Sequence, residues 1–191
     1  MASLKDYLLE VKLGKDPELN DLFNEALKKV FDPNFLNKIE GKITKLIKII
    51  SVKSNKDFVA YVKGNSIFVN TPVFEALPIS KRMNYLLHEF IHILQNKKSF
   101  AFFKDFKEIH NLENSLWNII KKYTNDPGKF LTNKNVPSSY IGKHETITYL
   151  MNNSINWNEI SKTGRLAFVN NIKQSGLFNL DSDFWKERLP H

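Results

Sequence analysis

One amphipathic stretch, residues 80–94, constrains the fold more than any other feature of the chain. Its apolar residues recur at helical spacing; they are Met83, Leu86, Leu87, Phe90, Ile91 and Leu94. This stripe predicts a helix with one side packed in a core, and Ser80 is a favourable N-cap for it. The other side carries His88, Glu89 and His92, which belong to the run His88-Glu89-Phe90-Ile91-His92. A helix anchored in the core would therefore present two histidines and a glutamate together.

The residues before this helix predict a small sheet. Two β-prone runs, 58–62 and 66–69, are joined by Gly64-Asn65, which is typical of a tight hairpin. The β-branched second half of residues 42–52 favours another strand. A short turn is expected at 71–72 and a loop at 125–139. Helices are expected at 4–13, from 16–17 to about 30, from about 34 into 42–52, and at 105–123, 143–153 and 166–173.

These elements predict one α+β domain spanning residues 1–191. We expect a helical N-terminal extension (1–45), a small antiparallel sheet with the histidine helix (46–98), and a mostly helical remainder (99–191). The length of 191 residues and 42% hydrophobic content suffice for one core. Because the chain has no cysteine, disulfides, a thiolate nucleophile and cysteine-ligated metals are excluded.

The charge gives little indication of a nucleic-acid partner. The formal net charge is +8, but 25 lysines and only 3 arginines are spread along the chain beside 22 asparagines. This is typical of a compositional bias, and arginine, the usual reader of bases, is scarce. No apolar run is long enough to span a membrane. Without a secretory signal in residues 1–10, a cytoplasmic location is the default expectation, with signal-independent export or virion association as alternatives.

The pattern H-E-x-x-H indicates a metal site. On a helix His88 and His92 lie one turn and about 40° apart, so both imidazoles can reach one cation. Two imidazoles and one carboxylate leave the cation a position for water, whose pKa falls toward neutrality. Glu89 would then accept a proton from that water as a general base. The alternative is that the two histidines are ordinary surface residues.

At these residues the chain resembles the zincin metallopeptidases, over residues 58–96 and more weakly to 153. The resemblance implies a zincin-like fold, a Zn²⁺ cofactor and hydrolysis of a polypeptide substrate by an endopeptidase. It also implies that an edge strand, here Ser66–Asn70, aligns the substrate. The metzincin group is excluded, because its longer motif requires Gly and His at the positions where this chain has Gln95 and Lys98. The remaining resemblance is to gluzincins, in which a later helix supplies a glutamate ligand.

Two glutamates are candidates for that third ligand. Glu113 lies in an apolar stripe 21 residues after His92, but it lacks the family's aspartate four residues further on. Glu145 resembles the ligand of compact bacterial and phage-type enzymes, in which H-E-x-x-H-x-x-Q is followed by Tyr-x-x-x-x-Glu. Gln95 and Tyr140 match that pattern. We therefore favour His88, His92 and Glu145 as the ligands.

Other residues receive secondary expectations. Tyr149 is the candidate donor to the oxyanion, with Tyr140 or His144 as alternatives, and an ordinary packing or surface role is the competing interpretation of all three. His110 and His191 are most simply solvated, and the aromatic stretch 100–106 is either a groove wall or core. Residues 1–38 are a possible propiece over the groove. The alternative to an enzyme is a catalytically silent zincin-like module that binds or builds a larger particle.

Overall fold

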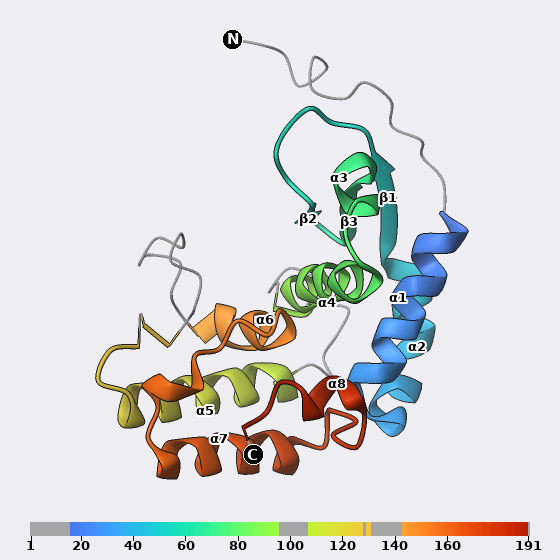
Figure 1. The fold of residues 1–191 in the computed structure, drawn as a ribbon. Coiled ribbons are helices and arrows are strands. Elements are labelled where there is room, and N and C mark those ends of the chain that lie inside the picture. Colours follow the sequence, from blue (N-terminus) through green and yellow to red (C-terminus); the bar gives the residue numbers. More distant parts are fainter. Residues whose placement is uncertain (1–15, 96–106, 128, 131–142, 191) are drawn as a thin grey trace.

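The computed structural model describes residues 16–95, 107–127, 129–130 and 143–190, and its fold is α+β (Figure 1). Its α-helices are α1 (Pro17–Val30), α2 (Pro33–Leu46), α3 (Thr71–Glu75), α4 (Ile79–Gln95), α5 (Lys107–Tyr123), α6 (Thr146–Met151), α7 (Lys162–Ser175) and α8 (Asp183–Lys186). Its strands are β1 (Lys48–Val52), β2 (Ala60–Lys63) and β3 (Ser66–Asn70), and its 3₁₀ helices are η5 (Lys143–Glu145) and η6 (Trp157–Glu159). The helix expected at 4–13, the stretch 100–106 and Tyr140 lie outside the described residues, as does most of the loop expected at 125–139.

The sheet has the strand order β1-β3-β2. The predicted hairpin is confirmed, since β2 and β3 are antiparallel and Gly64 takes a φ of +62° in the turn. The prediction of a purely antiparallel sheet is wrong, because β1 pairs with β3 in parallel, with Lys48 opposite Ser66. The chain leaves β1, reaches the far edge of the sheet at β2, and returns between the two strands as β3.

This order changes the expectation for the substrate strand. β3 has hydrogen-bonded neighbours on both sides, so it is central and its backbone groups are already used. The prediction that Ser66–Asn70 is an edge strand is therefore wrong. Within the described residues, the edges of this sheet are β1 and β2.

Asn70 fixes the connection between β1 and β2. It is fully buried, and its amide nitrogen donates to the carbonyls of Ser54, Lys56 and Phe58 at 3.1–3.2 Å. Its side-chain oxygen accepts from the backbone N–H of Ser54 at 3.1 Å. One side chain thus satisfies four backbone groups of the crossing segment, which holds β2 in its place at the edge.

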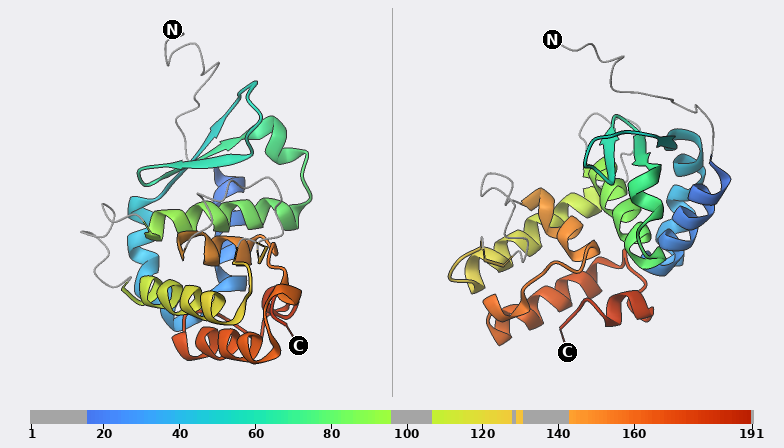
Figure 2. Two further views of the ribbon diagram at one scale, coloured as in Figure 1. Left: turned by 90° about the vertical axis from the view of Figure 1, so that its left-hand side faces the viewer. Right: turned by 45° about the horizontal axis from the view of Figure 1, so that its top comes forward.

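Helix α4 lies in the middle of the molecule, with the sheet on one side and α6, α5 and α7 on the other (Figure 2). It begins at Ile79, so Ser80 is its second residue and the predicted N-cap is wrong. The Pro78 carbonyl accepts from the N–H groups of Lys81 and Arg82 instead. The expected turn at 71–72 is the short helix α3.

Helix α1 packs on the apolar side of α4. Asp16 caps it by accepting from the Leu19 N–H, and Phe23 meets Phe90 edge to face with ring centroids 5.3 Å apart. Phe31 contacts Phe90 in the same way at 5.8 Å. These buried rings belong to the main core, which argues against residues 16–38 as a removable propiece.

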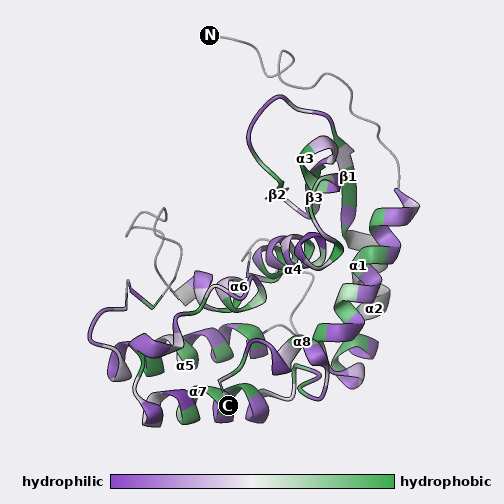
Figure 3. Ribbon diagram, in the orientation of Figure 1, coloured by the Kyte–Doolittle hydropathy of each residue, from purple (hydrophilic) through white to green (hydrophobic). Residues whose placement is uncertain are grey.

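The C-terminal helices close the core beneath α4. Apolar and polar residues share each longer helix, as expected for helices with one buried side (Figure 3). Gly164 lets α7 approach α5, because a Cβ there would lie 2.5 Å from Tyr123 Cβ. Within the described residues, no helix combines the length and apolar character needed to cross a membrane.

Candidate metal centre

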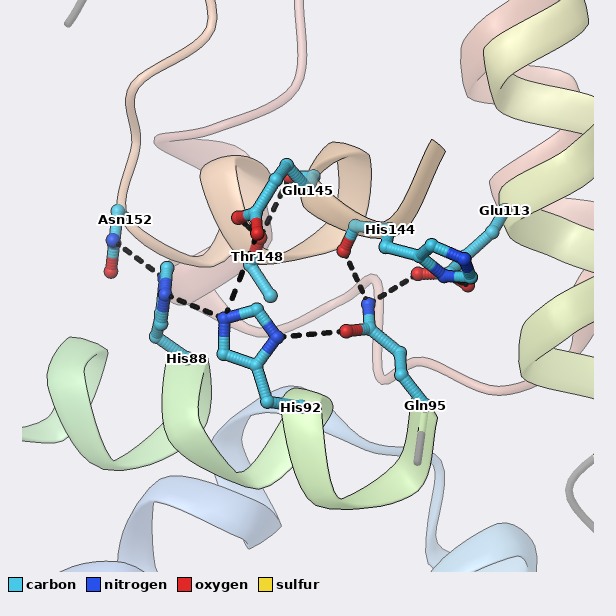
Figure 4. A network of polar contacts seen from close by, with 8 residues as sticks. All are labelled: His88, His92, Gln95, Glu113, His144, Glu145, Thr148 and Asn152. Carbon is cyan, nitrogen blue, oxygen red and sulfur yellow. Dashed lines mark hydrogen bonds and ion pairs between the residues drawn. The ribbon is translucent and has the colours of Figure 1, made fainter. Parts of the chain in front are cut away.

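Three expected ligands come together between α4 and the segment before α6. His88 and His92 project from α4, and Glu145 ends η5, which leads into α6 (Figure 4). One donor atom from each residue lies within 4.8 Å of the other two. The amphipathic pattern explains this arrangement, because α4 buries Phe90 against α1 and so directs the histidines the opposite way.

The separations between the candidate ligand atoms are close to those around a tetrahedrally coordinated zinc ion. The two Nε2 atoms of His88 and His92 are 3.0 Å apart, and their rings are nearly perpendicular at 80°. The distance from His92 Nε2 to Glu145 Oε1 is 3.9 Å. Ligand atoms about 2.0–2.1 Å from zinc in a tetrahedron are about 3.3 Å from one another. The observed separations of 3.0 Å and 3.9 Å lie on either side of this value.

His92 is oriented by Gln95, one turn further along α4. The Gln95 side-chain oxygen lies 2.9 Å from His92 Nδ1. Because this oxygen only accepts, His92 carries its proton on Nδ1 and keeps a lone pair on Nε2. The Gln95 amide nitrogen donates to the His144 carbonyl at 2.6 Å and to Glu113 Oε1. These contacts fix the amide, and the amide fixes the histidine tautomer.

His88 and Glu145 also have partners behind their donor atoms. The Asn152 amide lies 2.9 Å from His88 Nδ1, and the Thr148 hydroxyl donates to Glu145 Oε2 at 2.9 Å. The other carboxylate oxygen, Oε1, is the one that faces His92. If His88 binds an ion through Nε2, its proton is on Nδ1. A half-turn of the Asn152 amide would then place the amide oxygen where it can accept a hydrogen bond from Nδ1.

The buried position of His88 keeps its imidazole uncharged. Burial, and to a smaller extent the neighbouring His92, lower its pKa to about 4, although a hydrogen bond with the Thr148 backbone acts in the opposite direction. The imidazole is therefore neutral at neutral pH. Neutral imidazole is the ligand form that divalent transition metals require.

Glu89 lies between this group and the edge of the sheet. It is 8% exposed, and burial raises the pKa of its carboxyl, as does Glu145, while His92 and a hydrogen bond with the Val62 backbone lower it. Val62 is in a non-hydrogen-bonded pair of the hairpin, so its N–H points away from β3. Glu89 thus joins α4 to the outer edge of β2.

Tyr149 is one turn after Glu145. It is 7% exposed, and burial, with a further contribution from Glu145, raises its pKa to about 12. The phenol therefore keeps its proton at neutral pH and remains a possible hydrogen-bond donor. Its role toward an oxyanion stays a prediction.

The competing glutamate belongs to a different group. Glu113 is fully buried on α5, and its Oε2 lies 3.5 Å from His110 Nδ1 and 3.6 Å from His144 Nδ1. The prediction that His110 is simply solvated is wrong, because its side chain is only 18% exposed. His144 lies with these residues rather than with His88 and His92.

Sequence reasoning missed most of the supporting residues. Thr148 follows Glu145 by three residues, a local spacing that could have indicated the contact on a helical turn. Asn152 is 64 residues from His88, and Glu113 is 18 from Gln95, so no local pattern links them.

Comparison of the chain with protein-family models, with curated proteins and with solved structures finds no match. The functional interpretation therefore depends on the arrangement of the residues themselves. Two imidazoles and a carboxylate around one point can hold a divalent cation, with a buried carboxyl group beside it.

Proposed function

We propose that the chain is a zinc-dependent endopeptidase whose ion is bound by His88, His92 and Glu145. The observation that carries the proposal is the convergence of these three donors, with Glu89 adjacent to them. Two imidazoles and one carboxylate suit zinc, and three protein ligands leave a fourth position for solvent or substrate, as catalytic zinc sites require.

Glu89 is the proposed general base. A bound zinc ion lowers the pKa of a coordinated water toward neutrality and polarises a carbonyl oxygen. Because burial raises the Glu89 pKa, its carboxylate accepts a proton more readily than an exposed glutamate does. The same group would then deliver that proton to the leaving amine. Tyr149, which keeps its proton, is the proposed donor to the negative charge on the former carbonyl oxygen.

The outer edge of β2, which pairs with no other strand among the described residues, is the proposed site of substrate pairing, in place of β3. The backbone groups of Ala60 and the carbonyl of Val62 point away from β3, so an extended polypeptide can pair with them. Since the Val62 backbone contacts Glu89, a peptide aligned there would have its scissile bond near the base. Pairing through the backbone favours extended polypeptides over folded substrates.

The test compares two Glu→Gln variants of the full-length protein. Glu89→Gln keeps the size of the side chain but removes the base, and Glu108→Gln changes an exposed glutamate on α5. Both should retain zinc like the wild type, because neither residue is a proposed ligand. Cleavage of a mixture of quenched-fluorescence peptides should fall at least about 100-fold in Glu89→Gln only.

The outcomes separate the parts of the proposal. Zinc well below one equivalent in the wild type would contradict the metal centre. Wild-type protein that holds zinc yet cleaves no peptide would favour the silent module. Unchanged cleavage by Glu89→Gln would exclude this residue as the base.

A further inference from the structure

A second group of potential ligands lies beside the first. His110 and Glu113 are one turn apart on α5, and His144 is on η5, immediately before Glu145. Donor atoms of these three residues lie within 4.8 Å of one another. Figure 4 shows His144 and Glu113 together, on the far side of Gln95 from His92.

The distances in this group suit a shared cation. Both Nδ1 atoms face the same oxygen, Glu113 Oε2, at 3.5 Å from His110 and 3.6 Å from His144. These separations exceed the 2.7–3.2 Å of a good hydrogen bond. They are close to the separation of about 3.3 Å between two ligand atoms on a tetrahedral zinc. The two rings also approach at 85°, with centroids 6.2 Å apart, so they converge without stacking.

The two oxygens of Glu113 have separate partners. Oε1 accepts from the Gln95 amide, and Oε2 faces the two imidazoles. The carboxylate can therefore bind an ion through Oε2 without releasing Gln95. Its side chain is 1% exposed, so an ion bound through Oε2 would lie against a buried carboxyl group.

The group is accessible to solvent on one side. The His144 side chain is 49% exposed and that of His110 is 18% exposed. An ion could enter past His144, and water could complete its coordination. This group thus has the same donor set as the first, two histidines and one glutamate, and both groups are partly exposed to solvent.

We propose that His110, Glu113 and His144 form a second divalent-cation site, selective for Zn²⁺ and similar metals that accept imidazole ligands. The ion would tie η5 to α5. Since His144 and Glu145 are consecutive, it would also fix the position of the Glu145 carboxylate in the first site. The Gln95 amide contacts His92 on one side and Glu113 on the other, and so links the two sites.

Zinc counting with separate variants tests this proposal. Full-length protein is stripped with chelator, loaded with Zn²⁺ alone, freed of excess metal, and analysed for bound zinc. The wild type should hold about two equivalents, and His88→Ala and His110→Ala about one each. The double variant should hold none. Asn111→Ala, an exposed neighbour on α5, is the matched control and should hold two.

The results distinguish this site from the first. One equivalent in the wild type that persists in His110→Ala and disappears in His88→Ala would overturn the second site and leave the proposed enzyme intact. One equivalent in His88→Ala that disappears in the double variant supports the second site even if the protein cleaves no peptide. His144→Ala repeats the test if His110→Ala does not fold, as judged by circular dichroism, and two equivalents in that variant would also overturn the proposal.

Discussion

The contact between Gln95 and Glu113 connects the metal centre to the core, and a double-mutant cycle measures it. Gln95 is 8% exposed and Glu113 is fully buried, so solvent screens the contact little. A hydrogen bond to a buried charged group is worth about 1.5–3 kcal/mol. Replacing either residue with leucine removes this bond and leaves the other side chain buried without it. We therefore expect a coupling free energy of about 2 kcal/mol between the two substitutions.

The single substitutions should be costly. Gln95→Leu also removes the hydrogen bonds with the His144 carbonyl and with His92, at about 1 kcal/mol each, so the free energy of unfolding should fall by about 3–5 kcal/mol. Urea unfolding of the zinc-free protein at pH 7 gives these values. Gln174→Leu, at an exposed position on α7, is the control and should change stability by less than about 0.5 kcal/mol.

The cycle has a clear refuting result. If the effects of the two substitutions on the free energy of unfolding add within about 0.5 kcal/mol, the contact does not stabilise the protein and Glu113 does not hold Gln95 in place. The Gln95→Leu variant also tests whether Gln95 orients His92. Because residues behind a ligand orient it, zinc affinity in Gln95→Leu should fall by about 10–100-fold.

Three further predictions concern stability. Asn70→Ala should cost about 2–4 kcal/mol in urea unfolding, because four backbone groups of residues 54–58 lose their partner; a cost below about 0.5 kcal/mol would contradict the role given to this amide. Gly164→Ala should lower stability by about 1–3 kcal/mol, since its Cβ would lie 2.5 Å from Tyr123 Cβ, whereas Lys162→Ala at the exposed start of α7 should not. The His88 pKa of about 4 is below its ordinary value of 6.5, so the unfolded chain gains this proton first and the zinc-free protein loses stability as pH falls from about 7 to 4. The raised Glu89 pKa acts in the opposite direction. The free energy of unfolding is therefore measured against pH in both the wild type and His88→Gln. An equal slope in the two proteins would refute the lowered pKa of His88.

Local patterns predicted the elements that carry the histidines. The apolar stripe of α4 set the side on which His88 and His92 lie, since one turn of helix separates them whatever the rest of the fold does. The Gly64-Asn65 turn predicted the hairpin for the same reason, because a two-residue connection limits the strands to antiparallel pairing. Asp16 and Pro17 marked the start of α1.

Contacts between distant segments were not predictable in this way. The parallel pairing of β1 with β3 depends on the path of the crossing segment from β1 to β2, and no turn signal specifies it. His110 looked solvated because nothing in its own helix shows that η5 docks beside it. The choice of Glu145 came from a family resemblance, and the proximity of its carboxylate to His92 depends on how α6 packs against α4.

Anomalous X-ray scattering at the zinc absorption edge tests the central claim most directly. In crystals of the wild-type protein grown with zinc, we predict a peak about 2.0–2.2 Å from Nε2 of His88, Nε2 of His92 and Oε1 of Glu145. The absence of a peak between these three atoms, with the two imidazoles in contact with other protein groups instead, would contradict the proposed metal centre and the hydrolytic function that depends on it.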